Sequence, residues 1–85
     1  MTSNDINDNE KSVLIQLKHY FKRSRAIHFD LLSGEWRNAI INSIDEENKK
    51  VYLKEFVLGV IDYNFNEIDS NSIKEYTSNE GNENG

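Results

Sequence analysis

The chain has 85 residues, enough for one small domain, and a domain of this size buries only about 60% of its unfolded surface. It contains no cysteine, which excludes disulfides and thiolate metal sites and favours a reducing, intracellular setting. The net charge of −5 would ordinarily argue against nucleic acid as a partner. Because we find neither a leader pattern nor an apolar run of the ~20 residues that cross a membrane, we expect a soluble cytoplasmic or nuclear protein.

The charges are distributed unevenly along the chain. Residues 1–8 and 77–85 are polar and too poor in apolar groups to offset the entropy of ordering, so we predict two disordered tails around one domain at residues 9–76. The acidic residues outside this domain are not matched by bases, since every Lys and Arg lies within it. No acid occurs between residue 11 and Asp30, and the five bases of this segment form a local basic block: Lys11, Lys18, Lys22, Arg23 and Arg25.

Residues from about 9 to 24 have the spacing of an amphipathic helix. The apolar positions that fall on one stripe are Val13, Leu14, Leu17, Tyr20 and Phe21. Asn7 or Asn9 can cap the start of this helix. Bases crowd its last turns, where the negative end of the helix dipole stabilises cations. The bases therefore have two open explanations: they stabilise the end of the helix, or they bind phosphate.

Two runs of alternating apolar and polar residues follow, separated by Ser33-Gly34, which is typical of a β-hairpin turn. In the first run, Ile27, Phe29 and Leu31 fall on one face, as a half-buried strand requires. In the second run, both faces carry apolar groups, which indicates a long, bent, central strand. We predict the bend at the small residue Ala39.

The rest of the chain indicates further short strands. Residues 51–53 and 56–65 have strand patterns, and Gly59 within the second suggests a bulge or a close backbone approach. Ile68 and Ile73 supply the last apolar anchors. The predicted fold class is mainly β with one N-terminal α-helix, arranged as a small, five-stranded, strongly bent antiparallel barrel.

The hairpin resembles the first motif of the Sm-like (LSm) superfamily of small β-barrels. That motif spaces a turn glycine, a bend glycine, two apolar residues and an aspartate. With alanine at the bend, the matching residues here are Gly34, Ala39, Ile41, Ile44 and Asp45. Leu58-Gly59 is similar to the opening of the second motif. The resemblance covers roughly residues 11–70 and implies an Sm-like or SH3-like barrel that is RNA-associated, through RNA binding or as part of an RNA–protein complex.

The residues that read RNA in ring-forming Sm proteins are replaced in this chain. Asn48-Lys49-Lys50 stands where that pattern has an apolar-Asn pair, and Asn64-Phe65 stands where it has Arg-Gly. A small acidic bacterial member of the superfamily serves as a protein-binding module. The alternative function is therefore a protein-interaction or regulatory module without direct RNA binding.

No residue pattern in the chain indicates a reaction, so we predict a non-enzymatic protein with no cofactor. His19 and His28 are the only histidines, and no second metal ligand is spaced to join either. The carboxylates at 45–47 lie in a turn, whereas an acid–base pair needs burial to separate its pKa values. The sequence therefore favours a binding role.

The candidate nucleic-acid-binding residues are bases that can meet phosphates and an indole that can stack on a base. These are Lys18, Lys22, Arg23, Arg25, Trp36 and Arg37. The structural alternative for Trp36 is that it covers one mouth of the barrel. The expected partners are RNA or a ribonucleoprotein, a protein, or further copies of the chain joined through edge strands, where Tyr63 and Phe65 lie.

Overall fold

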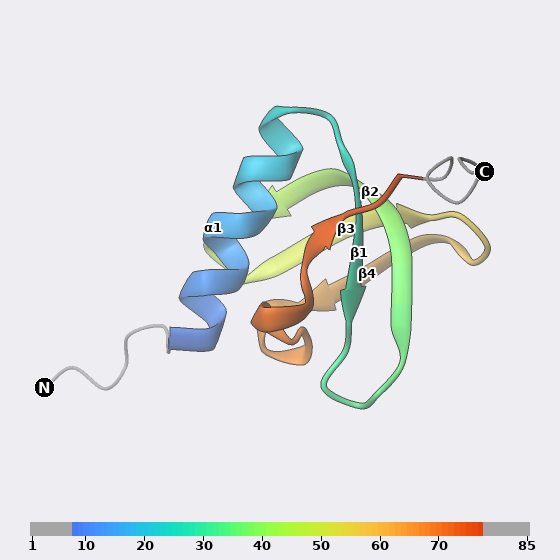
Figure 1. The fold of residues 1–85 in the computed structure, drawn as a ribbon. Coiled ribbons are helices and arrows are strands. Elements are labelled where there is room, and N and C mark those ends of the chain that lie inside the picture. The colour runs from blue at the N-terminus through green and yellow to red at the C-terminus, as the bar shows by residue number, and fades with distance from the viewer. Residues whose placement is uncertain (1–7, 78–85) are drawn as a thin grey trace, which may run out of the picture.

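The computed structural model describes residues 8–77, in which one helix lies against a five-stranded antiparallel sheet (Figure 1). The elements in chain order are α1 (Asp8–Lys22), β1 (Ala26–Asp30), β2 (Trp36–Asp45), β3 (Lys50–Glu55), β4 (Gly59–Asn64), the 3-10 helices η1 (Phe65–Glu67) and η2 (Ser70–Ser72), and β5 (Lys74–Glu75). The predicted class, mainly β with one N-terminal helix, is confirmed. Apart from Asp8 and Thr77, the two predicted tails lie outside the described residues.

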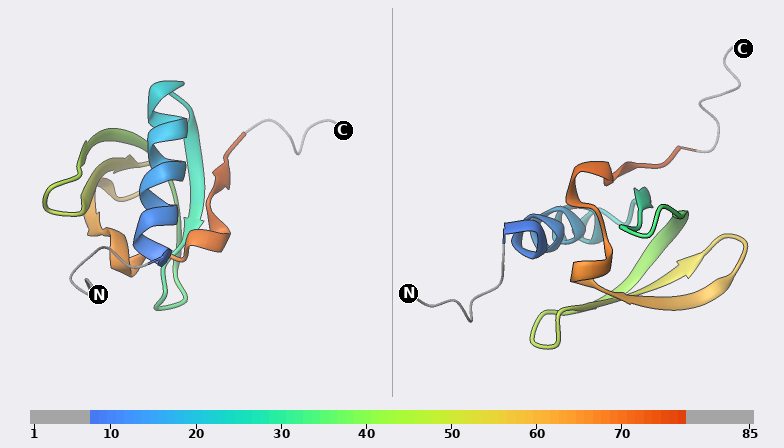
Figure 2. Two further views of the ribbon diagram at one scale, coloured as in Figure 1. Left: turned by 90° about the vertical axis from the view of Figure 1, so that its left-hand side faces the viewer. Right: turned by 90° about the horizontal axis from the view of Figure 1, so that it is seen from below.

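The strands are ordered β4-β3-β2-β1-β5 across the sheet. The hairpin between β1 and β2 forms as predicted, with Gly34 at a φ of 106° and its N–H donating to the Leu31 carbonyl at 2.9 Å. Both views of Figure 2 show the sheet bending around the core. Within the described chain β4 and β5 are the two edges of the sheet, so closure into a barrel is not confirmed.

The ten-residue strand β2 is central and pairs with both β1 and β3. Its ladder with β3 shifts between Ile41 and Ser43, so an irregularity lies at Asn42. The prediction that the strand bends at Ala39 stays a prediction. An extra residue in a strand is easiest to accommodate where its side chain reaches water, and Asn42 is exposed. Ala39 is instead fully buried where β2 is flanked on both sides.

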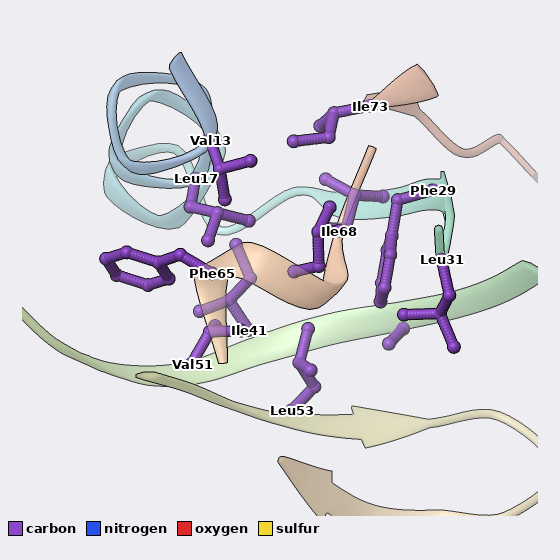
Figure 3. Packing of buried hydrophobic residues seen from close by; sticks show 12 residues of the cluster. Val13, Leu17, Phe29, Leu31, Ile41, Val51, Leu53, Phe65, Ile68 and Ile73 are labelled. Atoms are coloured by element: carbon purple, nitrogen blue, oxygen red, sulfur yellow. The ribbon is translucent and has the colours of Figure 1, made fainter. Parts of the chain in front are cut away.

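The core lies between α1 and the concave side of the bent sheet (Figure 3). The buried apolar side chains are Val13, Leu17, Ile27, Phe29, Leu31, Ala39, Ile41, Val51, Leu53, Phe65, Ile68 and Ile73. The predicted inward face of the first strand and the anchors Ile68 and Ile73 are thus confirmed. The prediction for Phe21 is wrong: in the last turn of α1, where the chain leaves for β1, its side chain is 43% exposed.

The segment predicted as one strand at 56–65 is divided among three elements. Residues 56–58 form a turn, β4 begins at Gly59, and Phe65 leaves the sheet in η1 to enter the core. Gly59 has a φ of 86° because it ends a turn, not because it interrupts a strand. The expected bulge at this glycine is therefore absent from the β3–β4 ladder.

Polar side chains of α1 fasten the helix to the segment between β4 and β5. The Asn9 amide donates to the Ile68 carbonyl at 3.0 Å and accepts from the Ser70 N–H at 3.1 Å. Gln16 donates to the Ser70 carbonyl at 2.7 Å. Asn9 therefore lies within the helix and makes a tertiary contact instead of the predicted cap, while Asn7 lies outside the described residues.

Candidate functional site

A groove of about 500 Å³ lies between the start of β2 and the loop that joins β3 to β4. Residues 36–38 contribute one side of it, residues 56–58 contribute the other, and Tyr76 after β5 also lines it. The Phe56 and Tyr76 rings are in contact, with centroids 5.6 Å apart. In Figure 1 and in the right view of Figure 2 the loop, in yellow, lies at the end of the β3–β4 hairpin that extends away from α1.

The groove is lined by large apolar side chains that the core does not use. Those more than half exposed are Trp36, Phe56, Val57 and Leu58. Val57 is the extreme case, since 87% of its surface remains accessible. Contiguous exposed apolar side chains bordered by polar groups are typical of interaction sites.

Glu55, the last residue of β3, organises the loop. Its carboxylate accepts the Val57 and Leu58 N–H groups at 2.7 and 2.6 Å and, with its other oxygen, the Asn38 N–H at 3.4 Å. The side chain is only 6% exposed, yet these bonds, that of Leu58 first, hold the pKa of Glu55 below its usual range. One buried carboxylate thus joins both sides of the groove.

The remaining backbone of the loop is also fixed. The Phe56 N–H donates to the Asn38 carbonyl at 3.1 Å, which adds a second link between the loop and β2. Gly59 supplies the positive φ that returns the chain to β4. Because its backbone is held in one conformation, the loop presents its apolar side chains as a preorganised surface.

Arg37 is held by the protein and has little capacity left for a ligand. Its guanidinium donates to the Tyr63 hydroxyl at 2.8 Å, the Trp36 carbonyl at 2.8 Å and Glu35 at 3.0 Å. The hydrogen bond to Tyr63 is the main cause that raises the pKa of Arg37 above its ordinary value. With its side chain only 19% exposed, Arg37 acts as a structural support behind the groove.

Trp36 presents its indole at the groove and does not cover the core. It is 57% exposed, and its ring stacks on His28 with centroids 5.7 Å apart and 29° between the planes. His28 is itself fixed by a 2.7 Å hydrogen bond to Asn38 and lies 3.5 Å from Asp30. The prediction that Trp36 covers a barrel mouth is wrong, whereas its role as an exposed stacking surface stays open.

The six predicted nucleic-acid-binding residues do not form one site. Trp36 and Arg37 line the groove, whereas Lys18, Lys22 and Arg23 line a separate depression of about 600 Å³ at the end of α1. The contacts of the bases are the ion pairs Lys18–Glu46 at 3.0 Å and Arg25–Glu75 at 3.4 Å, and the bonds of Arg23 to His19. Among residues 8–77, Lys22 has no ion-pair partner.

The loop 56–58 is the part of the groove that the sequence analysis missed. Three consecutive apolar residues fit a buried strand, which is what the sequence pattern predicts for them. The signal against that assignment is Glu55, because an acid directly before an apolar run cannot continue a buried strand unless its charge is satisfied. An acid followed by backbone N–H groups and a glycine is a turn pattern.

Neither the remaining chemical features of the described residues nor the comparisons with known proteins identify a function. Within residues 8–77, no group of three or more His, Asp or Glu side chains is placed to hold a metal ion. No helix in the same part of the chain is long and apolar enough to cross a membrane. No protein-family model, curated protein or solved structure matches this chain significantly.

Proposed function

We propose that this protein is a non-enzymatic interaction module whose groove binds an apolar segment of a partner protein. The observation that carries the proposal is the preorganised loop 56–58, which holds exposed apolar side chains opposite Trp36. Aromatic and aliphatic anchors around a concave surface are the usual centres of protein interfaces. A buried carboxylate, Glu55, holds the backbone of this loop by accepting the N–H groups of Val57 and Leu58.

The exposure of these side chains weakens a purely structural explanation. A chain of 85 residues has a small core, and burying Val57 and Leu58 would add to it. They instead point into water from an ordered turn, with 87% and 57% of their surfaces accessible. A binding partner that covers them recovers the hydrophobic free energy that folding leaves unused.

A peptide-display selection tests this function, with the wild-type protein as bait and the Val57→Ser/Leu58→Ser variant as counter-bait. Enriched peptides should carry apolar residues and change the fluorescence of Trp36, the single tryptophan of the chain. Each should bind the variant about tenfold more weakly or worse, because two anchors are lost. Peptides that bind both proteins equally, or a selection that enriches nothing, would contradict the proposal.

RNA association is the second candidate function, and the Sm-like resemblance of the hairpin supports it. The structural observation that favours it is the outer stripe of α1, where Lys11, Lys18 and Lys22 are all exposed. Together with Arg23, in the turn that follows the helix, they form a cationic face that can follow a phosphate backbone. We rank it second because neither Arg37 nor the acid-lined groove is available to phosphates.

A further inference from the structure

We infer that the groove selects a basic partner segment: apolar side chains lie against the loop 56–58 while a flanking Arg or Lys meets Trp36 and Glu35. The inference rests on the proposed function and specifies its ligand. It combines three independent features of the described residues, which are the apolar surface, the charge of the groove and the open indole.

The charged groups of the groove favour a cation. Its lining contains Glu35 and Glu55 against the single base Arg37, whose guanidinium is already shared among three acceptors. The Glu35 side chain is 65% exposed, and only one of its oxygens contacts Arg37. A cation from a partner can therefore pair with Glu35 without displacing an internal contact.

Trp36 supplies a place for the cation. One face of its indole is stacked on His28, and more than half of the side chain remains exposed toward solvent and the groove. An arginine or lysine over an indole gains cation–π attraction, which is strongest for tryptophan among the aromatic side chains. Because Glu35 is the neighbouring residue, the same cation can contact both groups.

The competing occupants fit the groove less well. A second copy would bring the same exposed acid, Glu35, against itself, which like-charge repulsion disfavours. A nucleic acid would bring phosphates to a lining whose only base is internally paired. The occupant that we propose for the groove is therefore a protein segment with apolar and basic residues.

The test uses three synthetic peptides with one Leu- and Phe-containing apolar core, flanked by Arg, by Gln or by Glu. Full-length protein is titrated with each peptide at low and at physiological salt, with Trp36 fluorescence and calorimetry as readouts. We expect the Arg-flanked peptide to bind about tenfold more tightly than the Glu-flanked one at low salt, and this ratio to shrink as salt is added.

Charge-neutralising variants then locate the preference. Glu35→Gln should reduce the Arg-over-Glu ratio severalfold, because it removes the carboxylate that the flanking cation would meet. Glu46→Gln is the matched control, since Glu46 pairs with Lys18 and is not part of the groove, and it should keep the full ratio.

The outcomes separate the two levels of the proposal. If the three peptides bind equally, or if Glu35→Gln leaves the ratio unchanged, the charge inference is overturned while the apolar groove stands. If no peptide changes Trp36 fluorescence, the proposed function fails as well. A basic protein segment would be the wrong ligand if a short single-stranded RNA competed with the Arg-flanked peptide for Trp36. It would also be wrong if self-association of the protein quenched the fluorescence of Trp36.

Discussion

Glu55 is a single side chain on which the shape of the groove depends. Replacing it by Gln keeps the size but leaves the side chain with one carbonyl oxygen and an NH2 group, so the N–H groups of Asn38, Val57 and Leu58 cannot all be satisfied. We expect Glu55→Gln to lower the free energy of unfolding by roughly 1–3 kcal/mol, measured by urea denaturation. An unchanged midpoint would show that these bonds do not hold the loop.

The same residue gives the stability a defined pH dependence. Because the folded pKa of Glu55 lies below its ordinary value of 4.5, its contribution is fully present above that value and is lost as the pH falls toward the folded pKa. The pKa of Asp45 is also lowered, chiefly by the Asn48 side chain, and acts in the same direction. Thermal melts from pH 6 to about pH 3 should therefore lose less stability in Glu55→Gln than in the wild type.

Ala39 tests the packing of the central strand. Its side chain is fully buried, and its partners in the two neighbouring strands are Ile27 and Glu55. Ala39→Leu should destabilise the protein by about 1–3 kcal/mol through overpacking, as measured by denaturant titration. Ala39→Gly should cost about 0.5–1 kcal/mol. A neutral effect of leucine would contradict the tight packing that the structure shows here.

Among the elements, α1 and the η1–η2 segment are joined by polar contacts that lie far apart in sequence. Removing the Asn9 amide leaves the Ile68 carbonyl and the Ser70 N–H without their partner, so we expect Asn9→Ala to cost about 1–3 kcal/mol. Urea denaturation measures the loss, and faster hydrogen exchange of the Ser70 amide locates it. Asn66→Ala, at an exposed position of η1, is the control and should stay within about 0.5 kcal/mol. Equal effects of the two substitutions would contradict the tether.

How far the sequence predicts an element depends on whether its burial follows a local period. The faces of α1, β1 and β3 alternate with the period of a helix or a strand, so their core residues were predictable. The turn at 56–58 has no such period, because its conformation is set by one acid and a glycine. The bulge at Asn42 was likewise missed, since a shift in the ladder depends on the neighbouring strand and not on β2 alone.

The candidate site could be predicted only in part for a related reason. The sequence predicts the aromatic residue Trp36 and the base Arg37 as interaction residues, and both line the groove. Their counterpart across the groove is placed there by the pairing of Ala39 with Glu55, a long-range contact that no local pattern gives. Arg37 and the bases of α1, grouped by charge in the sequence, line separate hollows of the molecule.

At the scale of the whole molecule, the distribution of charge decides between the two candidate functions. The net charge is −5, and the exposed bases of α1 form the cationic face on which an RNA backbone would lie. We expect single-stranded RNA to bind this face weakly at low salt and to be released as salt increases, because such binding depends on counterion release. Fluorescence anisotropy with a short RNA measures this affinity.

The decisive comparison reverses the same number of charges on two faces. Lys22→Glu/Arg23→Glu should abolish RNA binding, whereas Lys54→Glu/Lys74→Glu, at exposed positions of β3 and β5, should weaken it far less. Each phosphate contact that is lost should reduce the magnitude of the salt slope by about 0.7, which distinguishes direct contacts from a change in net charge. Circular dichroism must show that both variants keep the fold, since Arg23 also bonds the His19 carbonyl. Equal losses in the two variants would mean that RNA senses only the overall charge, and no binding by the wild type at low salt would leave the apolar groove as the functional surface.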